Sequence, residues 1–172
     1  MNKLWKRNIL RITFILILQL VLLKRVNLTF GGFNYVHLTI YALTIALLPY
    51  KLPRPLIIVI GFFLGLTIDI FYDSIGVHAG ATTMIAYLRY YVLAAIAPKE
   101  GYKKQGLTAF EYGVPWFLSY FSILLFIHLA TLYSLEAFSF VYFSEIALRT
   151  IFSFVASLFI CMVGILIFNP KY

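Results

Sequence analysis

Three charged side chains lie inside long apolar stretches of the sequence: Asp69, Arg89 and Arg149. A charge in a membrane interior is costly unless it is paired, protonated or hydrated, so each of these needs an explanation. Counting the rise per residue along each expected helix places Asp69 and Arg149 at a similar depth. We therefore predict an Asp69–Arg149 ion pair, with Glu145 as an i,i+4 competitor for Arg149. The three charges either fix the register and orientation of the helices or serve transport or a proton relay.

Catalysis and metal binding are the other chemistries to consider. Asp69 and Asp73 lie four residues apart on one expected helix, whereas membrane proteases with paired aspartates place them on two different helices. His37, His78 and His128 fall at the expected outer ends of apolar stretches, but their spacing matches no metal-binding motif. We expect these histidines to form interfacial hydrogen bonds. No GxSxG, HExxH, P-loop or dinucleotide motif occurs, so the sequence argues against an enzyme and predicts no metal or cofactor.

Six apolar stretches must position these residues, and each is about long enough to cross a bilayer as a helix. With 63% hydrophobic and 12% charged residues, the composition is typical of an integral membrane protein. We expect an all-α fold of six transmembrane helices in a single domain over residues 1–172, without a soluble domain. The single cysteine, Cys161, lies in the last stretch and is expected to be a packing residue. The predicted spans are residues 9–23, 35–50, 56–72, 77–97, 114–132 and 146–168.

The basic residues follow the positive-inside rule. With six crossings, ten of them fall on one side of the membrane and only Lys24 and Arg25 on the other. The net charge of +8 is therefore a topology signal with some affinity for anionic lipid, and does not indicate nucleic-acid binding. We predict a membrane protein with both termini in the cytoplasm. The ten residues are Lys3, Lys6, Arg7, Arg11, Lys51, Arg54, Lys99, Lys103, Lys104 and Lys171.

Small residues recur at helical spacing in three of the spans. In span 56–72, Gly61 and Gly65 form a GxxxG pair, which allows another helix to approach closely. The same style continues with Gly76, Gly80, Thr83 and Ala86 in span 77–97, and with Arg149, Ser153, Ser157, Cys161 and Gly164 in span 146–168. We predict that these three spans pack together with their small and polar faces inward.

Residues Gly61–Tyr102 resemble the MreD family, small membrane subunits of the bacterial rod-shape machinery, in particular its members from Bacteroidetes-type bacteria. The motifs that carry the resemblance are G-x-x-x-G-x-x-x-D at Gly61–Asp69, G-V-H-A at Gly76–Ala79, A-Y-L-R at Ala86–Arg89 and P-K-E-G-Y at Pro98–Tyr102. The length and the six spans of the whole chain also agree with the family. One departure is Tyr90, where members of this type often have a proline that would kink the helix.

The resemblance implies a protein without catalytic activity. MreD-like proteins associate with MreC, which has a single span, and together they link the MreB filament to peptidoglycan synthesis by RodA and a class B penicillin-binding transpeptidase. The family is also similar in its six-helix fold to the substrate-binding S-components of energy-coupling-factor transporters. By position, Asp69, Arg89 and Arg149 would serve internal structure and the response to partners. Close helix contact would fall to Gly61, Gly65, Gly76 and Gly80, and a cytoplasmic contact to Pro98, Lys99, Glu100, Gly101 and Tyr102.

Three functions stay open from the sequence. The leading one is a scaffold that offers lipid-facing grooves to the single helix of MreC. The main alternative is a substrate-binding transport subunit; S-components dock through small Ala-x-x-x-Ala motifs on their first helix, which span 9–23 lacks, although Ala42 and Ala46 have that spacing. The third is an accessory that handles lipid, suggested only by the intramembrane charges. The sequence also leaves a homodimer open.

Overall fold

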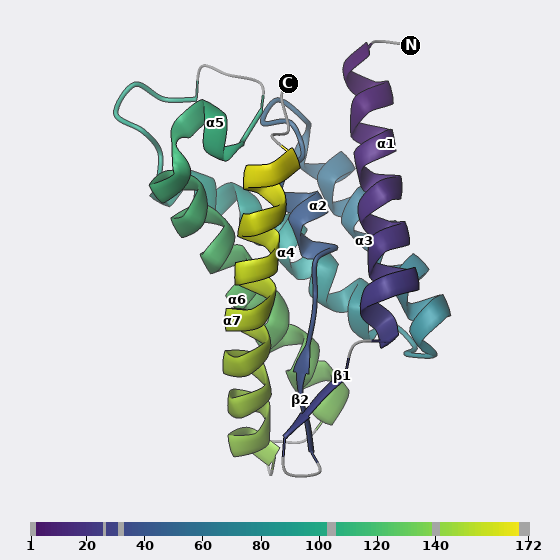
Figure 1. The fold of residues 1–172 in the computed structure, drawn as a ribbon. Helices are drawn as coiled ribbons and strands as arrows, with labels where there is room; N and C mark the ends of the chain where they lie inside the picture. The colour runs from purple at the N-terminus through teal and green to yellow at the C-terminus, as the bar shows by residue number, and fades with distance from the viewer. Residues whose placement is uncertain (1–2, 26, 31–32, 103–105, 139–141, 169–172) are drawn as a thin grey trace.

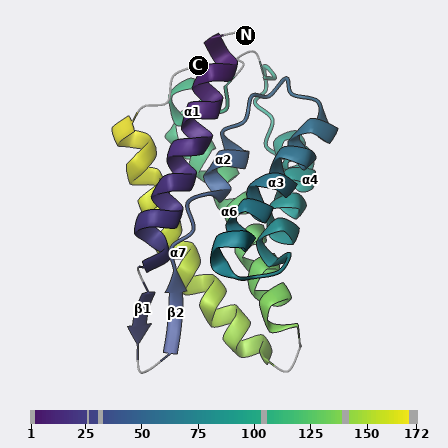
Figure 2. The same ribbon diagram turned by 90° about the vertical axis from the view of Figure 1, so that its right-hand side faces the viewer.

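The computed structural model describes residues 3–25, 27–30, 33–102, 106–138 and 142–168, which are mostly helical (Figure 1). The start of the first helix and the end of the last lie at one end of the molecule, and a two-stranded hairpin lies at the other (Figures 1 and 2). We call the second of these the hairpin end. The elements are α1 (Lys3–Ile17), the helical turns η1 (Leu18–Leu22) and η2 (Leu23–Arg25), β1 (Asn27–Phe30), β2 (Phe33–His37), α2 (Ala42–Ala46), α3 (Arg54–Tyr72), α4 (Val77–Ala95), α5 (Ala109–Tyr112), α6 (Val114–Ala137) and α7 (Phe143–Phe168).

Three helices in the described part of the chain are long and apolar enough to cross a membrane: α3, α6 and the Phe143–Ile167 part of α7. The apolar helical stretch Ile9–Leu22 is shorter. Helix α4 has the same 19-residue length as α3, but Arg89 and several tyrosines lower its hydropathy. The chain is thus built as a membrane-embedded protein, with three helices of clear membrane-spanning length.

The predicted helical span 35–50 is wrong. Its first residues form β2, which pairs antiparallel with β1, with Asn27 opposite His37 and Leu28 opposite Val36. The chain then runs without regular structure until the single short helix α2. The β-branched and aromatic residues at the start of this segment favour a strand, and a short apolar run does not distinguish a strand from a helix.

The helices pack in a row, and the order of the helices in this row differs from the prediction. Helix α3 packs along α4, α4 along α6, and α6 along α7, while β2 lies against α7. Spans 56–72 and 77–97 therefore do pack together, but α6 lies between them and span 146–168. The short helix α2 lies inside this arrangement, in contact with α4 and α6 (Figure 2).

The GxxxG pair lies at the contact between α3 and α4. A Cβ atom on Gly61 would come within 2.8 Å of the Ala86 Cβ, and one on Gly65 within 2.5 Å of the Ala79 Cα. Both distances are shorter than real contacts, so only glycine allows the two backbones to approach this closely. A Cβ on Gly80 would meet only the flexible end of Leu135, at 2.8 Å on α6.

Gly76 does not contribute to helix packing. It has a φ of +81° and precedes the first residue of α4, and a Cβ there would meet no atom within 4 Å. Glycine adopts this left-handed conformation without steric cost. Gly76 thus serves the tight turn between α3 and α4, which brings the start of α4 back over the end of α3.

Candidate functional site

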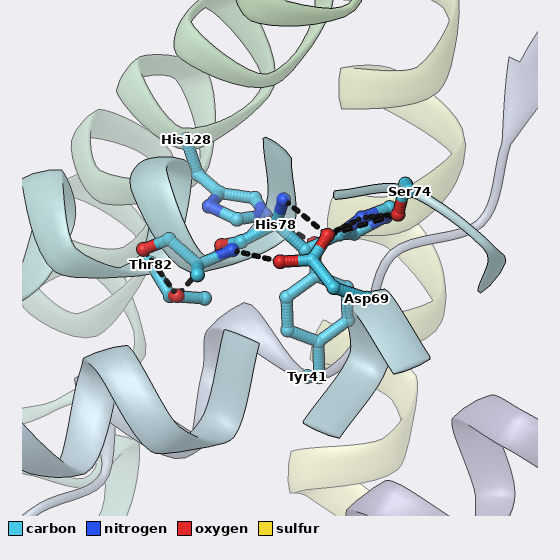
Figure 3. A network of polar contacts seen from close by, with 7 residues as sticks. Tyr41, Asp69, Ser74, His78, Thr82 and His128 are labelled. Atoms are coloured by element: carbon cyan, nitrogen blue, oxygen red, sulfur yellow. Dashed lines mark hydrogen bonds and ion pairs between the residues drawn. The ribbon is translucent and has the colours of Figure 1, made fainter. Parts of the chain in front are cut away.

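Asp69 binds the first turn of α4 (Figure 3). Its Oδ1 accepts hydrogen bonds from the backbone N–H of His78 at 2.9 Å and from the Ser74 hydroxyl at 2.9 Å, and it lies 3.1 Å from the His78 Nδ1. Its Oδ2 accepts the backbone N–H of Ala79 at 2.9 Å. The first amides of a helix have no partner within the helix, and the helix dipole favours an anion at that end. The buried carboxylate of Asp69 therefore closes the α3–α4 turn.

The predicted Asp69–Arg149 ion pair is wrong. Arg149 pairs with Glu145 through Nη2 at 2.8 Å and with Glu136 through Nη1 at 3.4 Å. Its local partner Glu145 was expected as a competitor, whereas Glu136 at the end of α6 was not. The depths of Asp69 and Arg149 were comparable along their own helices, but α7 packs on α6 and β2, and the amides at the start of α4 lie directly against Asp69.

Arg89 binds the end of α2. Its side chain is 2% exposed, and its Nε donates to the Tyr120 hydroxyl at 2.9 Å while its Nη2 donates to the carbonyl of Leu48. The Tyr120 hydroxyl donates in turn to the carbonyl of Ala46 at 3.2 Å. A cation at the carboxyl end of a helix is stabilised by the helix dipole and satisfies its unpaired carbonyls. Arg89 and Tyr120 thus hold α2 in the interior of the molecule.

Residues 37–40, which we call the extended segment, are bound on one side by the small polar face of α7. The Ser153 hydroxyl accepts the N–H of His37 at 3.0 Å, and the Ser157 hydroxyl accepts the N–H of Thr39 at 2.9 Å. Ser157 also donates to the carbonyl of His37 at 3.3 Å. The row of small residues in span 146–168 therefore supplies hydrogen bonds that a neighbouring strand would otherwise supply.

Gln19 binds the other side of the extended segment. Its Nε2 donates to the Leu38 carbonyl at 3.0 Å and its Oε1 accepts the N–H of Ile40 at 2.9 Å. The same Nε2 lies 3.0 Å from the Tyr72 hydroxyl. Non-helical backbone persists at membrane depth only where protein satisfies its polar groups. Sequence reasoning missed Gln19, although an amide in an otherwise apolar stretch was the signal that could have identified it.

Two of the three histidines contact one buried tyrosine. The His128 Nε2 lies 2.9 Å from the Tyr41 hydroxyl, and the two rings meet edge to face with centroids 5.1 Å apart. The His78 ring lies 5.9 Å from the Tyr41 ring. His128 is fully buried, so its hydrogen bond with Tyr41 lies in the interior of the protein. The described residues contain no group of three or more His, Cys, Asp or Glu that could hold a metal ion.

The segment Pro98–Tyr102 forms an exposed turn with a half-buried anchor, Tyr102. The N–H of Gly101 donates to the Pro98 carbonyl at 2.8 Å. The Tyr102 hydroxyl donates to the Leu93 carbonyl at 2.7 Å, and its ring lies 4.6 Å from that of Tyr50. Burial raises the pKa of Tyr102 above its ordinary value, so the hydroxyl remains a neutral donor. The turn presents Lys99 and Glu100 at the end that carries both termini.

Comparisons of the chain with models of protein families, with curated proteins and with solved structures found no match.

Proposed function

We propose that the chain is a non-enzymatic membrane scaffold of the bacterial cell-elongation machinery. In this role it binds MreC and helps to couple MreB filaments to peptidoglycan synthesis by RodA and its transpeptidase. The proposal starts from the resemblance of Gly61–Tyr102 to the MreD family. It includes a place in the inner membrane with cytoplasmic termini, which the distribution of basic residues supports.

The observation that carries the proposal is that the buried charges bind backbone groups of the protein itself. Asp69 binds backbone amides of α4, and Arg89 binds a backbone carbonyl beyond α2. Together with the close contact at Gly61 and Gly65, the residues of the resemblance hold one helical unit in a fixed shape. Charges engaged in this way support a protein whose shape is recognised by partners.

A substrate-binding transport subunit is the second candidate, and one observation favours it. The crossing from β2 through α2 is discontinuous, and transporters bind substrates and ions at the ends of such broken helices. Here the carbonyls at the end of α2 are already bound by Arg89 and Tyr120. A substrate would have to displace both side chains, so we place the scaffold first.

Gentle purification of the tagged chain from the membranes that contain it tests the proposal. We expect MreC and a class B penicillin-binding transpeptidase at amounts near that of the chain, measured by quantitative mass spectrometry against an untagged strain. Recovery of ATPase subunits or of a tightly bound small molecule in their place would overturn the scaffold and favour transport.

A further inference from the structure

Two adjoining hollows lie between α6 and α7 at the hairpin end. The first, which we call the apolar groove, has a volume of about 550 Å³ and is lined by residues that include Phe126, Ala130, Ser134, Ala147 and Thr150. The second, the charged pocket, has a volume of about 200 Å³ and contains Glu136, Glu145 and Arg149. Ile146 lines both, so the two hollows adjoin at this residue.

The charged pocket offers both signs of charge and one excess negative charge. Arg149 lies between the two glutamates and contacts Oε1 of each, at 2.8 Å for Glu145 and 3.4 Å for Glu136. The Nε of Arg149 is buried and has no hydrogen-bond partner among the residues that the structure describes, whereas 29% of the side chain as a whole is accessible. The carboxylates are partly exposed, with 39% of Glu145 and 53% of Glu136 accessible. The pocket can therefore bind a cation at its carboxylates and an anion at Arg149.

The apolar groove contains one buried polar group without a partner. Thr150 is 4% exposed, and within the described parts of the chain its Oγ1 has no hydrogen-bond partner. A buried hydroxyl without a partner is destabilising, and an acceptor on a bound molecule would remove that cost. Around it the groove opens towards the membrane, since Phe126, Phe143 and Ile151 are between 49% and 71% exposed. The occupant must be apolar, with an acceptor near its polar end.

A lipid fits these requirements better than a helix from a partner. A glycerophospholipid with a primary ammonium head group carries the needed groups in order. One of its acyl chains lies in the groove, an ester carbonyl accepts from Thr150, the phosphate meets Arg149 and the ammonium meets the carboxylates.

We propose that the groove and pocket between α6 and α7 form a binding site for one aminophospholipid, such as phosphatidylethanolamine. The site selects the head group through Glu136 and Glu145 and accommodates an acyl chain beside Ala147. This inference goes beyond the scaffold function and does not depend on which proteins the chain binds.

Native mass spectrometry of the purified full chain tests the proposal, with phosphatidylethanolamine and phosphatidylglycerol added in equal amounts. We expect the wild type to retain phosphatidylethanolamine about threefold or more over phosphatidylglycerol, the range of partly exposed charge pairs. The Glu136→Gln, Glu145→Gln double variant should lose this preference. Thr150→Val, which removes the hydroxyl at nearly constant shape, should lower retention of both lipids by about threefold.

Groove-filling variants provide the second arm. Ala147→Trp should abolish retention of both lipids, and Ser134→Trp on the other helix repeats the test should the first variant not fold. Ile70→Trp, at a position 69% exposed on α3, is the matched control and should bind like the wild type. Equal retention of the two lipids by the wild type, or unchanged binding in the folded groove-filling variants, would overturn the proposal. A protein found bound at this groove, with no lipid retained, would overturn it as well.

Discussion

Asp69 and Arg89 show how backbone groups can accommodate a single charge in an apolar interior. Each binds the end of a short or closely turned helix, where unpaired backbone groups and the helix dipole supply the opposite partial charge. The groups that bind such a charge are backbone amides or carbonyls at a helix end, and their position depends on how the chain folds back. This is why the depth of Asp69 along its helix could be estimated from the sequence but its partners could not.

Asp69→Ala should lower the free energy of unfolding by about 2 kcal/mol, since it removes the cap of α4 and leaves buried amides unpaired. Arg149→Ala should cost less than about 1 kcal/mol, because its ion pairs are partly exposed. The double variant should be additive within about 0.5 kcal/mol, measured by denaturation in detergent. A double variant more stable than Asp69→Ala alone would contradict this result and support an Asp69–Arg149 ion pair.

Arg89→Met should be more damaging, with a loss of about 3 kcal/mol, because it leaves the carbonyl of Leu48 buried without its charged donor. Tyr120→Phe should cost only about 1 kcal/mol, since it removes one hydroxyl from the same network. Limited proteolysis of the two variants in parallel gives the ranking. A smaller effect for Arg89→Met than for Tyr120→Phe would contradict the role of Arg89 at the end of α2.

At the scale of elements, hydropathy predicts the long helices but not the hairpin. The stretches that form α3, α6 and α7 are long and apolar enough to span a membrane, so hydropathy alone indicates them. Span 35–50 is as apolar as the others, but hydropathy reports burial and says nothing of backbone conformation. The sequence did contain a turn signal, Gly31-Gly32 between two apolar stretches, a pair common in tight hairpins. Those two residues lie outside the described ranges.

Ser157→Ala should loosen the extended segment, because it removes the acceptor of the Thr39 N–H and a donor to His37. We expect faster amide hydrogen exchange in peptides that cover residues 37–40, with little change in α6. Ser119→Ala is the matched control, since the Ser119 hydroxyl binds only within its own helix, at the Pro115 carbonyl. Equal exchange in the two variants would mean that α7 does not support this segment.

Gly65→Ala tests the contact between α3 and α4. The added methyl group would lie 2.5 Å from the Ala79 Cα, a backbone atom that cannot move independently of its helix, so we expect a loss of about 2 kcal/mol or more, as in overpacked cores. Gly164→Ala on α7 meets no atom within 4 Å and should be neutral or stabilising by up to about 1 kcal/mol. Thermal unfolding in detergent separates the two variants, and similar midpoints would argue against the close approach.

At the scale of the whole molecule, the charges and the fold together predict an orientation in the membrane. The loop before α3 and the loop after α4, which contain Lys51 and Lys99, lie at the end that carries both termini, away from the hairpin end (Figure 2). Helix α3 begins at the same end with Arg54. The positive-inside rule predicts that this end lies in the cytoplasm. In the predicted arrangement, the discontinuous crossing starts at the outer face and reaches the cytoplasmic loops beyond α2.

Cysteine labelling tests this orientation directly. Tyr142→Cys, at an exposed position at the start of α7, should react with a membrane-impermeant maleimide on intact spheroplasts, because it lies at the hairpin end. Glu100→Cys, in the exposed turn at the opposite end, should react only after the membrane is permeabilised. The native Cys161 is buried and should give little background, since the maleimide does not reach a thiol in the interior of the protein. The reverse pattern would invert the topology and move the lipid site between α6 and α7 to the cytoplasmic leaflet. Labelling of both positions from outside would mean that the chain crosses the membrane an even number of times, or not at all, between them.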